Sequence, residues 1–235
     1  MNHPVAVITG ASRGIGYAIA KKFASQGFHL FIGGTQKTKL KEIADQFKQE
    51  FGVKCAFFAA DLSQESNCVE FANAVLEEFA EIHVLVNNAG QFLGGKMMEE
   101  DSQQLRTMMD LNLFSAYHIT KKLWNKFAKN AKSHIFNMCS IASFTAYPAG
   151  GSYSITKFAL HGFTKSLRLE AMEKGIAVSS VMPGATLTDS WAGVDLPTER
   201  FMKSDDVAEM IFTAWKVNET TVMEEIVLRP FLGDI

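Results

Sequence analysis

The chain has 235 residues, of which 47% are hydrophobic and 20% charged, which is enough to bury a sizeable core and too apolar for a disordered chain. Its net charge of -2 gives no overall basic field, which argues against binding to nucleic acid or to an anionic membrane surface. Cys55, Cys68 and Cys139 form no CxxC pair, so we expect neither a disulfide framework nor a metal site, and the predicted location is the reducing cytoplasm.

The N-terminal residues do not have the pattern of a signal peptide, and the longest uncharged stretch, 135–156, is too polar to cross a bilayer. Short apolar runs alternate with longer amphipathic ones from one end of the chain to the other. Ile15, Ile19 and Phe23 predict the first helix, because they fall on one helical face, and Gly27 is its predicted stop. We expect strands at 5–9, 30–32, 56–59, 83–86, 135–138, 178–182 and 226–228, and further helices at 37–50, 65–80, 102–128, 152–174 and 205–217.

Repeated strand, helix, strand units require right-handed crossovers and a parallel sheet with helices on both faces. The sequence therefore predicts a doubly wound α/β fold with a mostly or wholly parallel seven-stranded sheet. No repeat, low-complexity tract or linker divides the chain, so we expect one domain spanning residues 1–235. The irregular segment 183–203 is either a lid over a site or an ordinary surface loop.

A glycine-rich segment, TGASRGIG at residues 9–16, lies between the first strand and the first helix. Small residues at this point let the backbone approach a pyrophosphate at the positive end of the helix. The spacing is TGxxxGxG rather than GxGxxG, and a tight strand-to-helix turn is the alternative interpretation. The candidate cofactor-binding residues here are Gly10, Ser12, Arg13, Gly14, Ile15 and Gly16.

With this loop the sequence resembles the short-chain dehydrogenase/reductase family, in particular its members similar to 3-oxoacyl-[acyl-carrier-protein] reductases, over nearly the whole chain. The family's Asn-Asn-Ala-Gly motif recurs at residues 87–90, and its Asp-Leu pair recurs as Asp61 and Leu62. The resemblance implies a Rossmann domain in which Asp61 and Leu62 flank the adenine and Asn88, Ala89 and Gly90 line the adenosine side. A helix cap at Asp61 and a turn at 88–90 are the structural alternatives.

The first acidic residue of the chain is Glu42, whereas a site selective for NAD usually carries an acid about 20 residues after the glycines. Gly34 stands at that place and Thr35 follows it, with Arg13 in the glycine loop. We therefore expect NADP(H), with NAD(H) the less favoured cofactor. The alternative is that the basic residues of the acid-free segment 1–41 are ordinary solvated surface.

The family's catalytic Tyr-x-x-x-Lys signature occurs three times, at Tyr17, Tyr117 and Tyr153, because any amphipathic helix readily produces this spacing. In the family a serine precedes the catalytic tyrosine by thirteen residues, and among the three only Tyr153 has one, at Ser140. Asn112 matches the family's fourth catalytic position. The expected catalytic set is Asn112, Ser140, Tyr153 and Lys157.

Reduction of a carbonyl needs a proton as well as a hydride, and Tyr153 is expected to supply it. Its ordinary pKa of about 10 would have to fall by about 3 units for reversible work near neutrality, and the charge of Lys157 one turn away favours that fall. The resemblance implies that Lys157 also binds the nicotinamide ribose, that Ser140 holds the substrate oxygen, and that Asn112 holds a water linking Lys157 to solvent.

After the sixth strand, PGATLT at residues 183–188 resembles the family's motif for the nicotinamide end, which adds Pro183, Gly184, Thr186 and Thr188 to the cofactor-binding candidates. A strand-ending turn is the alternative. Phe92, Phe144, Tyr147 and Trp191 suggest an apolar substrate pocket or, equally, core.

The expected activity is NADP(H)-dependent transfer of a hydride between the nicotinamide and a small carbonyl or alcohol substrate. The alternatives are an NAD-dependent alcohol dehydrogenase and a dinucleotide-binding sensor or scaffold without turnover. A homodimer or homotetramer is also expected, as in relatives of the family, through apolar helix faces and the last strand at Ile226 and Leu228. The helix faces carry Leu105, Met108, Met109, Leu113 and Tyr117 on one helix and Phe158, His161, Phe163 and Leu167 on the other.

Overall fold

A computed structural model of the chain describes residues 3–128, 131–148, 150–191, 193 and 195–235. Within these residues a seven-stranded sheet runs in the order β3-β2-β1-β4-β5-β6-β7, and every neighbouring pair is parallel. The predicted doubly wound α/β fold is confirmed, and the sheet, expected to be mostly or wholly parallel, is wholly parallel in the described residues. The strands are β1 (Val5–Ile8), β2 (His29–Gly34), β3 (Cys55–Ala59), β4 (Val84–Asn87), β5 (Ser133–Met138), β6 (Ile176–Pro183) and β7 (Glu225–Leu228).

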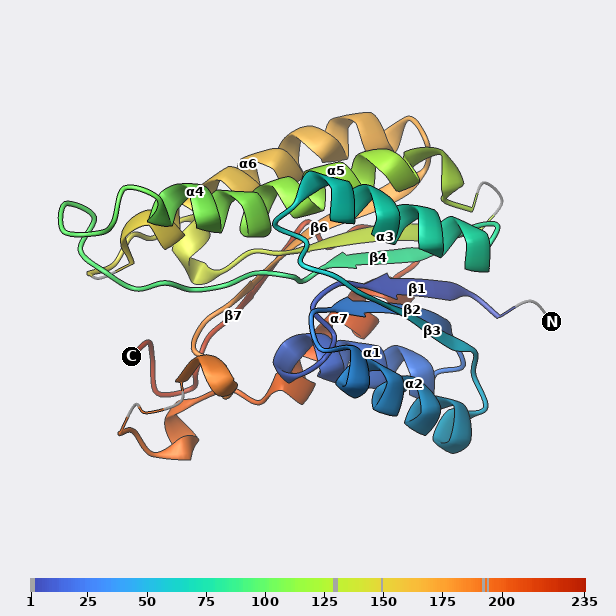
Figure 1. The fold of residues 1–235 in the computed structure, drawn as a ribbon, viewed down its shortest axis with the longest axis horizontal. Helices are drawn as coiled ribbons and strands as arrows, with labels where there is room; N and C mark the ends of the chain where they lie inside the picture. Colours follow the sequence, from blue (N-terminus) through green and yellow to red (C-terminus); the bar gives the residue numbers. More distant parts are fainter. Residues whose placement is uncertain (1–2, 129–130, 149, 192, 194) are drawn as a thin grey trace.

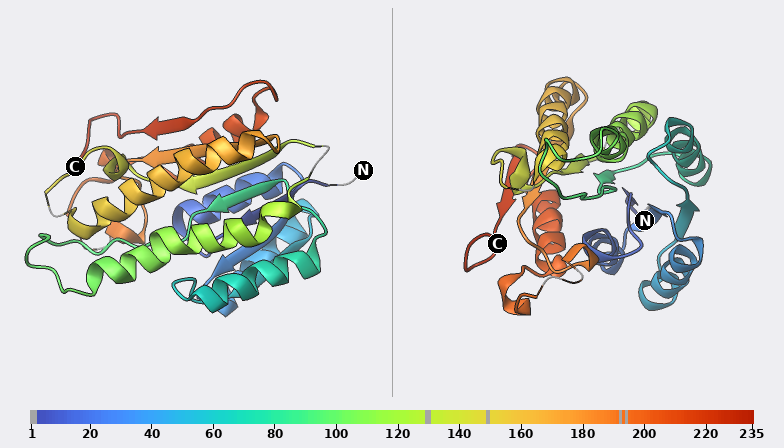
Figure 2. Two further views of the ribbon diagram at one scale, coloured as in Figure 1. Left: turned by 90° about the horizontal axis from the view of Figure 1, so that it is seen from above. Right: turned by 60° about the vertical axis from the view of Figure 1, so that its left-hand side comes forward.

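Helices cover both faces of the sheet, with α1, α2 and α7 on one face and α3, α4, α5 and α6 on the other (Figures 1 and 2). Each face has its own core, one around Phe23 and Phe47 and one around Phe71 and Ile119. Because both faces are covered, the central strands β1 and β4 are buried along their whole length. The helices are α1 (Gly14–Ser25), α2 (Lys37–Phe51), α3 (Glu65–Glu78), α4 (Gln104–Met109), α5 (Ser115–Leu123), α6 (Gly151–Met172) and α7 (Ser204–Lys216).

The single helix expected over residues 102–128 is not continuous. Between α4 and α5 the chain makes a π-helical turn, η1 (Asp110–Phe114), and after α5 it tightens into a 3-10 turn, η2 (Trp124–Lys126). A π turn holds one residue more than an α turn, so it changes the direction of the side chains that follow. Asn112 lies within this turn and is buried. Hydrophobic periodicity did not reveal this local change.

The segment predicted as a lid or loop, 183–203, contains two short 3-10 turns, η4 (Asp189–Trp191) and η5 (Thr198–Arg200). Its base is closed where Thr186 pairs with Met202 in an isolated parallel bridge and the Leu187 amide donates to the Met202 carbonyl. Residues 192 and 194 of the segment lie outside the described residues. The base of the segment is therefore anchored by contacts between residues 185–187 and Met202.

From the pair β1 and β4, successive strands are added toward opposite edges of the sheet. The chain after β1 and the chain after β4 accordingly leave on opposite faces. In such sheets ligands bind outside the carboxyl ends of the strands at this point. The long loops that follow the strands gather at one end of the molecule, away from the N-terminus (Figures 1 and 2). The candidate site is built from these loops. Along the described residues, no helix combines the length and the apolar character needed to cross a membrane.

Candidate active site

The glycine loop joins β1 to α1 and packs tightly enough to need glycine at particular positions. Gly14 has a φ of +56°, and a Cβ on Gly16 would lie 2.2 Å from the Gly10 carbonyl oxygen. The first turn of α1 contains no acidic residue, and its N-cap, Arg13, makes no side-chain capping bond. Its amide groups and its positive end therefore suit a phosphate, and this loop fits the pyrophosphate of a dinucleotide.

Asn88 fastens the end of β4 to the glycine loop. Its Nδ2 donates to the carbonyl oxygens of Thr9 and Gly10, each at 3.0 Å. The backbone amides of Asn88 and Ala89 both donate to the Thr9 hydroxyl at 2.9 Å. The side-chain NH2 group and the backbone N–H of Asn88 thus bond within the protein, and the contribution of these groups to a cofactor site is to hold the glycine loop in shape.

The other candidates on the adenosine side lie at the ends of β2 and β3. A Cβ on Gly34 would lie 3.4 Å from the Ser12 hydroxyl, so the end of β2 adjoins the glycine loop. Thr35 follows it and is exposed. Asp61 is exposed and its carboxylate accepts from the Ser63 amide at 3.0 Å, whereas Leu62 is buried. The helix α3 begins four residues after Asp61, so Asp61 shapes the turn before that helix and is not its N-cap.

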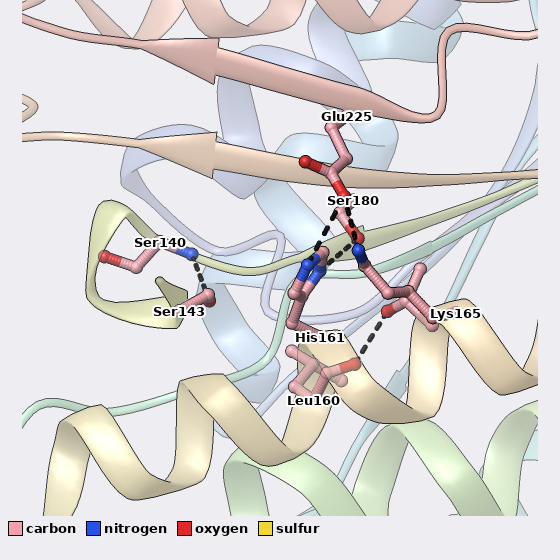
Figure 3. Close-up of polar contacts among 8 residues, drawn as sticks. Ser140, Ser143, Leu160, His161, Lys165, Ser180 and Glu225 are labelled. Atoms are coloured by element: carbon pink, nitrogen blue, oxygen red, sulfur yellow. Dashed lines mark hydrogen bonds and ion pairs between the residues drawn. The ribbon is translucent and has the colours of Figure 1, made fainter. Parts of the chain in front are cut away.

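Ser140, Tyr153 and Lys157 come together where β5 ends and α6 begins. The Lys157 Nζ donates to the Met138 carbonyl at 2.7 Å and lies 5.6 Å from the centroid of the Tyr153 ring. The Ser140 hydroxyl accepts from the Ala142 amide at 3.1 Å, and the Ser140 amide donates to the Ser143 hydroxyl (Figure 3). This reciprocal capping fixes Ser140 at the start of the short turn η3 (Ile141–Ser143).

Burial dominates the ionisation of this cluster. It raises the pKa of Tyr153 to about 12, while the hydrogen bond with Ser140 acts in the opposite direction. It also lowers the pKa of Lys157 to about 8, because a buried ammonium is poorly solvated. The fall in the Tyr153 pKa expected from the sequence is therefore not found in this structure, where burial of the phenol outweighs the opposing hydrogen bond with Ser140.

Asn112 links the loop after β4 to helix α6. Its Oδ1 accepts from the Gln91 amide at 2.8 Å, and its Nδ2 donates to the Gln91 carbonyl and to the Thr156 hydroxyl, each at 3.0 Å. Thr156 in turn donates to the Tyr153 carbonyl. Both amide hydrogens of Asn112 are used in these bonds, so its side chain cannot also donate to the water that the family resemblance implies.

The other two Tyr-x-x-x-Lys pairs lie elsewhere. Tyr17 packs against Phe47, with a distance of 5.8 Å between ring centroids. Tyr117 is 40% exposed on α5, and Lys121 donates to its hydroxyl at the surface. Tyr153 is the tyrosine that meets Ser140.

A polar cluster beyond Lys157 holds helix α6 on the sheet. His161 lies 3.0 Å from the Ser180 hydroxyl on β6 and 3.4 Å from the Glu225 carboxylate on β7, and Lys165 lies 3.1 Å from the same carboxylate (Figure 3). These contacts fix the middle of α6 over the last two strands, which restricts where Tyr153 and Lys157 can point.

The segment after β6 returns to the glycine loop. A Cβ on Gly14 would lie 3.1 Å from the Thr188 methyl group, and Arg13 pairs with Asp189. Thr186 is buried and donates to the Gly184 carbonyl, while a Cβ on Gly184, next to Pro183, would meet Pro230. Thr188 is therefore the member of this motif that touches the proposed phosphate loop.

Of the four apolar candidates, Phe92 is the one that contacts Tyr153, with its ring edge-on to the Tyr153 ring at 5.0 Å between centroids. Phe144 and Tyr147 are 42% and 39% exposed, and Trp191 packs against Phe201. An exposed aromatic group in contact with Tyr153, as Phe92 is, suits an apolar part of a substrate.

The family model for short chain dehydrogenases matches residues 4–197 of the chain. The chain belongs to the short chain dehydrogenase family. This short chain dehydrogenase superposes on an alcohol dehydrogenase from Thermococcus sibiricus complexed with 5-hydroxy-NADP, with a TM-score of 0.92, 30% identity, and coverage of 100% of this chain and 99% of the other.

Two further proteins are similar over most of their length. L-sorbose reductase from Gluconobacter frateurii, complexed with NADPH and L-sorbose, superposes with a TM-score of 0.90 at 26% identity, covering 98% of this chain and 96% of the other. A diacetyl reductase of Staphylococcus epidermidis that forms (S)-acetoin is 32% identical, over 87% of this chain and 79% of its own. The short chain dehydrogenase described here is thus an oxidoreductase acting between CH-OH and C=O groups.

Sequence reasoning missed the buried polar residues that support this dehydrogenase site. Asn87 donates to Thr120 and to Asn137, and Asn137 donates to Thr164, which forms a ladder across the ends of β4 and β5. The sequence signal that could have indicated this ladder is an Asn near the end of each of two apolar strands. A second missed contact, between Glu100 and Ser152, had no sequence signal, since the two residues are far apart in the chain.

Proposed function

We propose that this short chain dehydrogenase reduces a carbonyl group with NADPH, or oxidises the corresponding alcohol with NADP+, using Tyr153 as proton donor and acceptor. The observation that carries the proposal is the continuity from the phosphate loop to the catalytic cluster. Asn88 binds the glycine loop, and two residues later a Cβ on Gly90 would lie 3.2 Å from the Asn112 Oδ1 and 3.7 Å from the Lys157 Nζ. A cofactor held by the loop would reach the cluster along this segment.

When bound, the reduced cofactor supplies the hydride. Tyr153 supplies the proton, and its raised pKa keeps the phenol protonated at neutral pH, ready for a product alkoxide that is far more basic. Ser140 holds the substrate oxygen as negative charge develops. Lys157 uses one N–H on the Met138 carbonyl and has further N–H groups for the nicotinamide ribose. Asn112 positions the helix through Thr156.

The preference for NADP(H) over NAD(H) is supported by the end of β2. Gly34 puts no carboxylate beside Ser12, and Arg13 and Thr35 are exposed where a ribose phosphate would need partners. The two solved structures at 26% and 30% identity are complexes with NADPH and with 5-hydroxy-NADP. A phosphate is recognised by cationic and hydroxyl groups, whereas NAD selection needs an acid.

The substrate is proposed as a small carbonyl compound with an apolar portion that contacts Phe92. The named relatives reduce diacetyl and L-sorbose. A 3-oxoacyl thioester, suggested by the sequence resemblance, is a second candidate.

Consumption of reduced cofactor by the purified chain tests the proposal. A vicinal diketone, a keto sugar, an aryl ketone and a 3-oxoacyl thioester are each offered with NADPH and with NADH. We expect oxidation of NADPH with at least one ketone, at a higher kcat/KM than with NADH. A preference for NADH would favour the NAD-dependent alternative. Cofactor binding without turnover of any ketone would favour a sensor or scaffold.

A homodimer or homotetramer is proposed from the outer faces of α5 and α6. Tyr117 and Phe158 on these helices are 40% and 46% exposed, and Phe114, just before α5, and Leu169, on α6, are also exposed. Met108 and Leu167, which the sequence placed on the same faces, are buried within the chain and add nothing to this surface. The exposed aromatic groups favour burial against a second copy.

A further inference from the structure

The catalytic helix α6 begins two residues before Tyr153, and its N-cap is Gly150, which has no side chain to satisfy the amide groups of the first turn. Glu100, from the loop between β4 and α4, takes that role. Its two carboxylate oxygens lie 3.2 Å and 3.3 Å from the Ser152 amide, and it also accepts from the Ser152 hydroxyl. Ser152 is 4% exposed, so water has little access to this contact.

Two glycines make room for the Glu100 side chain. Gly151 has a φ of +32°, and a Cβ there would lie 1.9 Å from the Glu100 Oε1 and 2.8 Å from the Gly95 carbonyl oxygen. A Cβ on Gly95 would lie 2.9 Å from the Glu100 Cγ. Any side chain at either position would push the carboxylate away from Ser152. The close packing on both sides indicates a specific fit.

The loop that carries Glu100 also carries Phe92, whose ring meets the Tyr153 ring edge-on. The start of the loop is held by the paired bonds between Asn112 and the Gln91 backbone, and its middle by a bond from Gln104 to the Leu93 carbonyl. Glu100 holds the far end against α6. One carboxylate thus joins the loop beside the substrate to the first turn of the helix that presents the proton donor.

From this geometry we infer that Glu100 is a positioning residue for the reaction, acting through Ser152 to set the Tyr153 hydroxyl and the Phe92 loop relative to each other. The inference rests on the proposed function. Glu100 touches neither the phenol nor the proposed substrate oxygen, so it acts on turnover through placement and through its charge.

The negative charge of Glu100 also affects the ionisation of Tyr153, separately from its effect on placement. The amino end of a helix favours an anion, and without a neighbouring carboxylate that effect would stabilise the Tyr153 phenolate. Glu100 supplies a competing anion at the same helix end. The other titratable groups facing the phenol are Lys157 on α6, Cys139 at the end of β5 and Tyr147 before α6. Removing only the Glu100 charge should therefore shift the pH profile of alcohol oxidation to lower pH.

Three variants separate placement from charge. Glu100→Ala removes both, and Glu100→Gln keeps an acceptor for the Ser152 amide but removes the charge. Glu99→Ala is the matched control, because Glu99 is an exposed neighbour that pairs with Lys96. With the best ketone, Glu100→Ala should lower kcat by about tenfold or more and raise KM for the ketone, leaving NADPH affinity unchanged. Glu100→Gln should recover most of kcat and shift the pH profile down by a fraction of a unit. Glu99→Ala should match the wild type.

Amide hydrogen exchange tests the contact between Glu100 and Ser152 without requiring turnover. The amides of residues 151–157 should exchange faster in Glu100→Ala than in the wild type or in Glu99→Ala, since the first turn of α6 loses its acceptor. Unchanged exchange together with wild-type kcat, KM and pH profile in Glu100→Ala would overturn the inference, as would an equal loss in Glu99→Ala. If the wild type turns over no ketone, the proposed function fails, and accelerated exchange confined to Glu100→Ala still supports the anchoring contact, whereas unchanged exchange removes it.

Discussion

Arg13 and Asp189 lie 176 residues apart in the sequence, yet the Arg13 Nη1 and the Asp189 Oδ2 are 2.9 Å apart. Both side chains are 66% exposed, so the pair is screened by solvent and easily exchanged for another partner. The contact joins the glycine loop to the segment after β6, next to the point where Thr188 approaches Gly14. A cofactor phosphate at Arg13 would compete with Asp189 for the guanidinium.

Arg13→Ala should weaken NADPH binding by about tenfold and leave NADH binding nearly unchanged, because a charge-assisted bond to a phosphate is lost. Asp189→Asn should strengthen NADPH binding a few-fold, since Arg13 no longer has a competing carboxylate. Fluorescence titration of each reduced cofactor measures both effects. Lys21→Ala, in the same basic segment, is the control. Equal weakening of NADPH and NADH by Arg13→Ala would show that Arg13 does not recognise the ribose phosphate.

Gly34→Asp should shift the cofactor preference from NADPH toward NADH. A Cβ at this position would make an ordinary contact of 3.4 Å with the Ser12 hydroxyl, so the substitution fits without displacing the backbone. The new carboxylate would repel a ribose phosphate and accept from free ribose hydroxyls. The ratio of kcat/KM for NADPH to that for NADH should fall by at least about tenfold. A ratio unchanged from the wild type would place the ribose elsewhere.

Most of the architecture could be predicted from the sequence because it depends on periodicity and strand order. The alternation of apolar and amphipathic segments predicted the parallel sheet. The thirteen-residue offset from Ser140 to Tyr153 distinguished Tyr153 from the tyrosines of the other two Tyr-x-x-x-Lys pairs. The π turn at Asn112 could not be predicted, since it conserves the helical pattern on both sides. The raised pKa of Tyr153 and the bonds of Asn88 to Thr9 and Gly10 depend on burial and on distances between remote segments, which spacing does not encode.

Stability should fall as the pH is lowered, because of His134. This side chain is stacked on Phe136 and contacts Ser179, and burial lowers its pKa to about 3. The unfolded chain takes up this proton near pH 6.5 and the folded chain does not, so stability is complete above pH 6.5 and declines below it. By this linkage His134 alone should cost about 2 kcal/mol between pH 7.5 and pH 5.

Urea unfolding at the two pH values measures that loss. His134→Gln, which keeps a polar group for Ser179, should reduce the pH dependence even if it lowers stability at pH 7.5. Stability that is constant or higher at pH 5 in the wild type would contradict the assignment of a neutral, buried His134.

Assembly should depend on the outer face of α5 and α6. Light scattering should give a mass at least twice that of one chain at micromolar concentration. Phe158→Glu should lower it toward a monomer, because it places a charge among apolar groups that the second copy would cover. Leu232→Glu, on an exposed residue near the C-terminus, tests whether the effect is specific to the helices. An active wild-type protein that is strictly monomeric would eliminate the proposed oligomer and leave the catalytic proposal intact.

The most direct test of the account compares Tyr153→Phe with Tyr117→Phe in the reduction of the best ketone by NADPH. Both variants lose one hydroxyl from a Tyr-x-x-x-Lys pair and keep the ring, but Tyr153 is the one that meets Ser140. Tyr153→Phe should lower kcat by about a thousandfold with NADPH affinity nearly intact, and Tyr117→Phe should retain wild-type kcat. Retention of activity in Tyr153→Phe together with its loss in Tyr117→Phe would contradict the assignment of the proton donor.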